Sequence, residues 1–219
     1  MKPSFFDLSK LENLSVRESI TRVREFLKDR VLDLGCGEQP YASIVKEKAS
    51  EYFGMDVMVR DTKRPDVCAD SLSLPFKGHS FDTVLCTQVL EHVKDPFILF
   101  HQVSRVLKDA GCLILTAPQA WPLHEEPYDF FRYTKYGLTE LAESNSLRVI
   151  KLEERGGGIS AIGQLTAAVL YDIFGRKRIT RVPMKIALAP ILSLCRALDK
   201  IFYYPKFTLG YLLVAQKIK

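Results

Sequence analysis

The chain has 219 residues, of which 47% are hydrophobic and 26% are charged, and its formal net charge is +5. These values are those of a globular protein with one sizeable core, and they exclude a chain that is mostly disordered. No stretch reaches the roughly 18 uninterrupted apolar residues of a membrane-spanning helix, and the opening MKPSFFDLSK has no apolar signal-peptide core.

The cysteine pattern argues against a metal centre. The five cysteines are Cys36, Cys68, Cys86, Cys112 and Cys195. They are widely spaced, and no two form the Cys-x-x-Cys pair that is typical of zinc sites. The same spacing argues against a disulfide framework and favours a reducing compartment. We therefore expect a cytoplasmic protein without a bound metal.

Short apolar runs alternate with helical segments along most of the chain. Residues 1–29 predict a helical lead-in, because charged and apolar residues alternate there at helical spacing. Extended segments are expected at 31–34, 51–57, 66–69, 81–87, 112–118, 147–154 and 209–218, and helices at 41–48, 96–108 and 134–144. This alternation predicts an α/β fold with a doubly wound parallel sheet over 30–219.

The pattern changes between the glycines at 156–158 and the last strand. Two apolar helices are expected, at 159–174 and 183–202, and the turn between them is basic. Its basic residues are Arg176, Lys177, Arg178, Arg181 and Lys185. We interpret 156–206 as a helical cap inserted before the last strand. For 159–202 we favour an ordinary cap packed on the domain; a lid at an anionic membrane surface and a homodimer face are the alternatives.

Glycines and acids follow the first strands, where an open parallel sheet binds its ligands. The first strand ends at Asp33 and runs into Gly35-Cys36-Gly37, whose glycines allow a ligand to approach the backbone closely. The second strand ends at Asp56, which can accept both hydroxyls of a ribose and would repel a 2′-phosphate. The third glycine of the dinucleotide motif is missing. These residues predict a nucleotide site and leave the nucleotide open.

The order of motifs resembles that of the class I S-adenosylmethionine-dependent methyltransferases. The matching stretches are VLDLGCGEQPY (31–41), YFGMDV (52–57), ADSLSLPFKGHSFDTVLCTQVLEHVKDP (69–96) and GCLILTAP (111–118). The resemblance implies a Rossmann-like, mostly parallel seven-stranded sheet with an antiparallel last strand, and S-adenosylmethionine as cofactor. This cofactor has no diphosphate, which explains the missing glycine.

The resemblance also implies which residues bind the cofactor. They are Asp33, Gly35, Cys36, Gly37, Asp56, Val57, Asp70, Ser71, Leu72 and Gln88. In such enzymes the two glycines pack against the methionine part, and Asp33 supports their loop. Asp56 is expected to hold the ribose, and Gln88 to border the methionine end.

The loop 118–134 after the fifth strand is the expected acceptor-facing segment, and it carries two of the three catalytic candidates. His124 is predicted to be a base or substrate ligand; the alternative is a histidine that bonds a backbone group. Arg132 could hold an acidic substrate group, but an ion pair with Asp129 that fixes the loop is the favoured alternative. The third candidate, His92, faces the methyl donor or packs its helix.

We therefore expect methyl transfer to a small molecule, at the oxygen of a sugar, quinone or lipid-linked metabolite. A nucleic-acid substrate is disfavoured, because TQVL (87–90) lacks the Asn/Asp-Pro-Pro-aromatic turn of amino-methylating enzymes. The alternatives are a catalytically silent cofactor-binding partner subunit, a dinucleotide-dependent oxidoreductase, and a membrane-surface protein whose helices do the main work.

Overall fold

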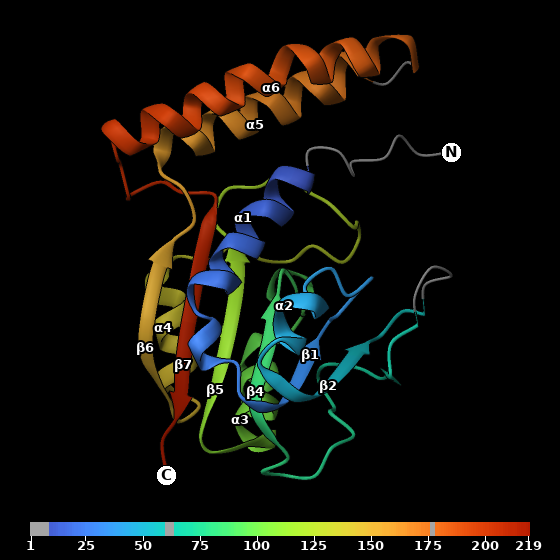
Figure 1. The fold of residues 1–219 in the computed structure, drawn as a ribbon, viewed down its shortest axis with the longest axis vertical. Coiled ribbons are helices and arrows are strands. Elements are labelled where there is room, and N and C mark those ends of the chain that lie inside the picture. The colour runs from blue at the N-terminus through green and yellow to red at the C-terminus, as the bar shows by residue number, and fades with distance from the viewer. Residues whose placement is uncertain (1–8, 60–63, 176–177) are drawn as a thin grey trace.

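A sheet of seven strands forms the centre of the protein. The computed structural model describes residues 9–59, 64–175 and 178–219 (Figure 1). The strands are β1 (Asp29–Leu34), β2 (Ala49–Asp56), β3 (Val67–Cys68), β4 (Phe81–Thr87), β5 (Leu107–Pro118), β6 (Leu147–Glu154) and β7 (Gly210–Lys217). Their order is β3-β2-β1-β4-β5-β7-β6, and β7 runs antiparallel to both of its neighbours. The predicted mostly parallel sheet with an antiparallel last strand is confirmed.

Helices cover both faces of the sheet. Figure 1 shows α1 (Ser9–Arg22) and α2 (Ala42–Lys46) over one face, and α3 (Pro96–Val106) and α4 (Lys135–Glu143) over the other. Residues 1–8 of the expected lead-in lie outside the described residues. Asp95 and Thr134 start α3 and α4, since each side chain accepts a hydrogen bond from a backbone N–H of the first turn. The sheet is therefore doubly wound, as predicted.

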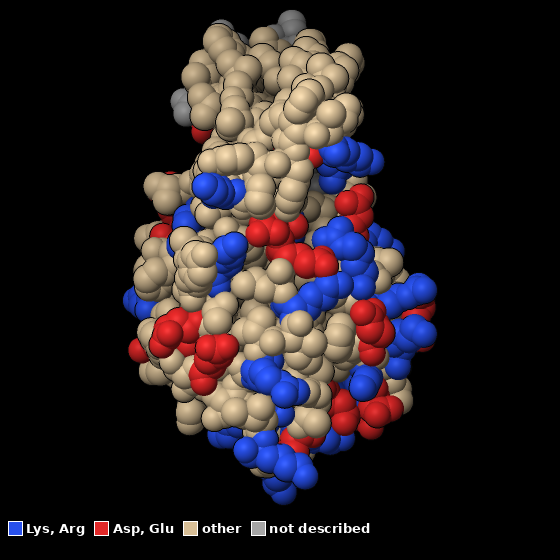
Figure 2. Space-filling model, turned by 90° about the vertical axis from the view of Figure 1, so that its left-hand side faces the viewer, with Lys and Arg blue, Asp and Glu red and all other residues tan. Residues whose placement is uncertain are grey.

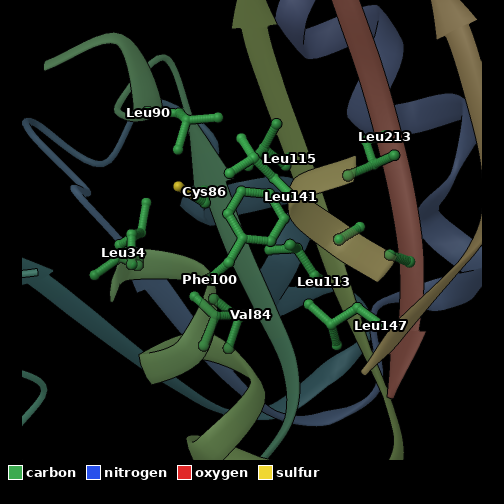
Figure 3. Close-up of a cluster of buried hydrophobic side chains, with 14 of the residues drawn as sticks. Leu34, Val84, Cys86, Leu90, Phe100, Leu113, Leu115, Leu141, Leu147 and Leu213 are labelled. Atoms are coloured by element: carbon green, nitrogen blue, oxygen red, sulfur yellow. The ribbon is translucent and has the colours of Figure 1, made fainter. Parts of the chain in front are cut away.

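Alternate residues of the central strands build two separate apolar clusters. On β5, Leu113 and Leu115 belong to the cluster under α3 and α4, whereas Ile114 belongs to the cluster under α1 and α2. Figure 3 shows Phe100 of α3 and Leu141 of α4 packed against the first of these faces. A strand buried on both faces is apolar throughout, which explains why the strands appear as continuous apolar runs in the sequence.

Two long helices form a hairpin beyond the end of the sheet at which β5 finishes. They are α5 (Gly158–Phe174) and α6 (Arg178–Ile201), and they lie side by side (Figure 1). Their buried apolar residues form a third cluster, separate from those of the sheet. Asp199 fixes the base of the hairpin, because its carboxylate accepts the backbone N–H groups of Gly157, Ile159 and Ser160 at 2.8–3.1 Å. Among the described residues, the hairpin thus packs chiefly on itself, and its base adjoins the sheet domain, where Arg196 pairs with Glu18 of α1 at 3.7 Å.

Within the described ranges, no helix combines the length and the apolar character that crossing a bilayer requires.

Candidate functional site

The turn after β1 depends on two glycines with left-handed backbone. Gly35 has a φ of +70° and Gly37 a φ of +51°. The backbone N–H groups of Gly35 and Cys36 donate to the carbonyl of Met55 at 2.8 and 3.0 Å, so the turn is held against β2. A Cβ atom on Gly35 would lie 2.2 Å from Cγ2 of Val89. Both the conformation and the space therefore require glycine at position 35.

Asp33 and Asp56 are fixed by hydrogen bonds at the ends of β1 and β2. The Asp56 carboxylate accepts the backbone N–H groups of Gly37 and Met58, both at 2.9 Å. Asp33 is fully buried, and the hydroxyl of Tyr52 donates to it at 2.6 Å. Burial and the neighbouring Asp33 raise the pKa of Tyr52, so this phenol keeps its proton and remains a donor. The turn between the two strands is thus rigid.

A pocket opens at the carboxyl ends of β1, β2 and β4. The predicted cofactor-binding residues that line it are Gly35, Gly37, Asp56, Val57, Ser71 and Gln88. The other four, Asp33, Cys36, Asp70 and Leu72, are not part of its wall. Asp70 shapes the turn instead, because its carboxylate accepts the backbone N–H of Leu72 at 2.9 Å.

Sequence reasoning missed part of the wall. Met58, Ala69 and Val89 line the pocket, but an apolar side chain beside a motif carries no chemical signal of its own. The glycine motif does not by itself point to Val89. Placing Val89 beside Gly35 requires knowing that β4, which precedes Val89, pairs with β1.

Gln88, at the rim of this pocket, has an uncommon backbone conformation, with a φ of +53°. Two bonds to Thr116 on β5 hold it there: its backbone N–H donates to the carbonyl at 3.0 Å, and its amide donates to the hydroxyl at 3.1 Å. Strained residues that their surroundings hold in place cluster at functional sites. Gln88 thereby starts the turn that leads into the short helix η3 (Leu90–His92).

The loop after β5 is bonded to η3 at several points. The carbonyl of Glu91 accepts the backbone N–H groups of Phe130 and Phe131 at 2.8 and 3.3 Å. The hydroxyl of Tyr133 donates to the carbonyl of Leu90 at 3.1 Å. Nδ1 of His92 lies 2.6 Å from the carbonyl oxygen of Tyr128. These bonds bring the expected acceptor-facing loop beside the end of β4.

Arg132 holds this loop in shape. It pairs with both oxygens of Asp129 at 2.6 and 2.7 Å, and it also donates to the carbonyls of Trp121, Pro122 and Phe131. Burial alone would raise the pKa of Asp129, but hydrogen bonds from Arg132 and from the backbone of His124 outweigh it and lower this pKa to about 2. A guanidinium has five N–H donors, and all five are used here. The geometry therefore favours the loop-fixing role of Arg132 over a role in holding substrate.

His92 and His124 lie together where the loop after β5 meets the pocket. Their rings meet edge to face with centroids 4.6 Å apart, and His92 lines the pocket. Nδ1 of His124 lies 3.2 Å from the carbonyl oxygen of Pro122 and 3.2 Å from Oδ2 of Asp129. Burial and the neighbouring His92 lower the pKa of His124, so its neutral form is favoured. The structure thus brings two of the three catalytic candidates into contact.

Comparison with known proteins places this pocket in a family context. A family model described as a methyltransferase domain matches residues 32–115. Over 88 residues the chain is 39% identical to an uncharacterized protein of Methanocaldococcus jannaschii. The aligned region covers 39% of each of the two chains. Over 96 residues the chain is 31% identical to the ubiquinone biosynthesis O-methyltransferase of Paracidovorax citrulli. This aligned region covers 37% of the present chain and 40% of the relative. The match thus spans about two fifths of the length of these curated relatives.

A solved structure matches over nearly the whole chain. It is a SAM-dependent methyltransferase from Archaeoglobus fulgidus, with a TM-score of 0.61, 20% sequence identity, and coverage of 98% of this chain and 100% of that one. At this identity the likeness shows the fold.

Proposed function

The chain carries a class I S-adenosylmethionine-dependent methyltransferase domain, and we propose that it transfers the methyl group of this cofactor to an oxygen of a small-molecule acceptor. The observation that carries the proposal is the pocket formed by the glycine turn, Asp56 and Gln88, with a pair of histidines at its far end. The oxygen acceptor is supported by the name of the ubiquinone biosynthesis relative, which is an O-methyltransferase.

The residues of the pocket fit the cofactor. Each oxygen of Asp56 accepts one backbone hydrogen bond, and a carboxylate oxygen has room for a second, so both ribose hydroxyls can still be bound. Gly35 and Gly37 leave the backbone open to close approach. Bound there, S-adenosylmethionine supplies a methyl group on a positively charged sulfur.

The chain's own contribution is to position the acceptor and handle its proton. Nδ1 of each histidine faces oxygens that only accept hydrogen bonds, so Nδ1 carries a proton. In the neutral ring of His124, Nε2 then carries the lone pair. This end of the pocket can therefore polarise or deprotonate a hydroxyl, while the Asp129–Arg132 pair keeps the loop in place.

Calorimetry on the full chain tests the cofactor. S-adenosylmethionine should bind, NADH should not, and Asp56→Ala should weaken binding by at least tenfold through loss of the ribose contacts. Asp109→Ala, a substitution at an exposed acid far from the pocket, is the control. Binding of NADH in place of S-adenosylmethionine would favour an oxidoreductase and contradict the proposal.

Turnover tests the methyl transfer. Incubation with sugar, quinone and lipid-linked acceptors should release S-adenosylhomocysteine, and the product should carry a new methoxy carbon signal by NMR. Cofactor binding without turnover on any acceptor would favour the silent partner subunit. A new methyl group on carbon or nitrogen would refute the oxygen acceptor.

We further propose that the α5–α6 hairpin rests on an anionic membrane surface and so brings the pocket to a lipid-linked acceptor. Its exposed large apolar side chains include Ile162, Ile173, Ile186, Ile191, Leu194 and Ile201, each more than half exposed. Figure 2 shows that the hairpin end of the molecule is almost free of charged side chains on this face. From Ile173 to Leu198 the sequence has six basic residues and no acid, and one of the six, Arg196, pairs with Glu18 of α1. Exposed apolar surface with basic residues and without acids suits the interface of an anionic bilayer.

Vesicle flotation tests the membrane contact. The protein should float with vesicles that contain phosphatidylglycerol, binding should fall with added salt, and Ile186→Glu with Leu194→Glu should abolish it. Ile218→Glu, at an exposed apolar residue outside the hairpin, is the matched control. A stable dimer in solution that the hairpin substitutions dissociate, together with no flotation, would assign this surface to a second copy of the chain instead.

A further inference from the structure

Three side chains that commonly bind metal ions meet at the acceptor end of the pocket. Glu91 and His92 are neighbours in η3, and His124 comes from the loop after β5. One ligand atom from each lies within 4.8 Å of the others. Atoms that share a metal ion at about 2.1 Å are roughly 3 to 4 Å apart. A small inward movement of these side chains would therefore complete a site.

Both histidines are oriented as metal ligands usually are. Nδ1 of His92 is held at 2.6 Å by the carbonyl oxygen of Tyr128. Nδ1 of His124 faces the carbonyl oxygen of Pro122 and the carboxylate of Asp129, each at 3.2 Å. Metal-binding histidines typically donate their second ring N–H to such an oxygen, which fixes the ring and leaves Nε2 as the ligand. Arg132 in turn anchors Asp129, so the support is rigid.

Glu91 supplies a carboxylate that the fold has removed from water. It has no exposed surface, and it comes directly before His92 in η3. A carboxylate oxygen beside two imidazole nitrogens is a ligand set that divalent transition metals accept.

We propose that Glu91, His92 and His124 bind a divalent transition-metal ion that holds the acceptor oxygen next to the cofactor. Two imidazoles and one carboxylate suit Mn²⁺, Fe²⁺ or Zn²⁺ better than Mg²⁺ or Ca²⁺, which prefer oxygen ligands throughout. Three protein ligands leave positions open for substrate, as in catalytic metal sites. His92 also lines the cofactor pocket, so an ion bound to it would lie next to that pocket. The inference rests on the proposed methyl transfer to oxygen.

The ion would define the chemistry and the class of acceptor. An acceptor hydroxyl bound to it loses its proton to solvent more readily, since metal ions lower the pKa of oxygen ligands. The new bond joins this oxygen to the methyl carbon, and the carbon–sulfur bond breaks with its electron pair going to sulfur, which becomes a neutral thioether. An acceptor with a second oxygen beside the hydroxyl would chelate the ion and be preferred over a simple alcohol.

Metal titration of the chelator-treated full chain tests the site directly. Loss of the free Mn²⁺ signal in electron paramagnetic resonance should report one bound ion per chain, and Zn²⁺ should compete for it. Glu91→Gln and His124→Ala should each weaken Mn²⁺ binding by at least tenfold. His101→Ala, at an exposed histidine of α3, is the matched control and should bind Mn²⁺ normally.

The outcomes separate this inference from the proposed function. Cofactor affinity and thermal unfolding are measured on each variant, and if Glu91→Gln does not fold, His124→Ala decides. Normal cofactor binding without Mn²⁺ or Zn²⁺ binding, or metal binding that both variants leave unchanged, would overturn the metal site and leave the methyltransferase proposal standing. Failure of cofactor binding would overturn the proposed function, whatever the titration of metal shows.

Discussion

Gly35 concentrates two constraints in one residue. Its φ of +70° would strain any residue that has a side chain, and a Cβ atom at this position would lie 2.2 Å from Cγ2 of Val89. Gly37 shares the first constraint but has no atom within 4 Å of its Cβ position. The two positions therefore allow the cost of backbone strain to be separated from the cost of steric overlap.

We expect Gly35→Ala to lower the free energy of unfolding by about 3 kcal/mol and Gly37→Ala by about 1 kcal/mol, from the usual cost of a strained backbone with and without a clash. Denaturant titration measures both. Gly137→Ala in α4 is the control, because its Cβ would make only an ordinary 3.6 Å contact with Thr134. Equal losses at positions 35 and 37 would show that the contact with Val89 relaxes freely.

Cys36 lies in the same turn, and its thiol is predicted to be unreactive. Burial, and then the charges of Asp33 and Asp56, raise its pKa to about 12, so almost no thiolate forms at neutral pH. Cys68 is exposed. Iodoacetamide at pH 7.5 followed by peptide mass spectrometry should find Cys68 modified first and Cys36 protected until the chain unfolds. Equal rates at the two positions would contradict the protection.

At the scale of elements, the acceptor-facing loop owes its shape to the Asp129–Arg132 pair. The pKa of Asp129 in the folded protein, about 2, lies below its ordinary value near 4. The carboxylate therefore adds stability above about pH 4, and this contribution is lost as the pH falls toward 2.

We expect Asp129→Asn to destabilise the protein clearly at pH 6 and much less at pH 2.5, where about a quarter of the native Asp129 is itself protonated and most of its charge-dependent stabilisation is lost. Denaturation at the two pH values measures this difference, with Asp109→Asn as a control at an exposed acid. A destabilisation that stays the same at both pH values would mean that Asp129 acts through its shape and not through its charge.

The elements themselves were largely predictable. The bounds of β4 and β6 agree with the predicted 81–87 and 147–154, since apolar periodicity marks buried strands directly. The predicted helix 96–108 ends earlier, at Val106, because Leu107 already pairs with Phe81 of β4. The second hairpin helix, predicted to begin at Pro183, begins earlier, at Arg178, so that Pro183 and Pro190 both lie inside α6.

At the scale of the whole molecule, the hairpin stands apart from the sheet domain. Its own buried cluster consists of Ala167, Ala168, Tyr171, Leu188 and Leu192. Such a small core gives far less stability than the two clusters of the sheet, so the hairpin should open locally while the domain stays folded.

Hydrogen exchange followed by mass spectrometry should therefore show faster exchange in α5 and α6 than in α3 and β5. Addition of anionic vesicles should slow exchange in the hairpin alone, if it binds them as proposed. Equal protection of hairpin and sheet without vesicles would contradict an independent unit.

The sequence by itself determined the sheet and the position of the pocket that we propose for the cofactor. Glycines and acids that directly follow apolar strands indicate a ligand-binding pocket, because the carboxyl ends of parallel strands meet at one edge of the sheet. Gly35, Asp56 and Gln88 meet there whatever the details of the loops.

Only the tertiary structure decided how the remaining residues are used. The contact of His92 with His124 joins two segments that are distant in sequence, and the exposure of the hairpin depends on what the rest of the fold leaves uncovered. The local sequence predicts helices, strands and turns. The path of a loop also depends on hydrogen bonds to other segments, which the local sequence does not identify. Histidines that lie apart in the sequence therefore gave no sign of the cluster of Glu91, His92 and His124. An apolar helix pair likewise gave no sign of which face the fold would leave uncovered.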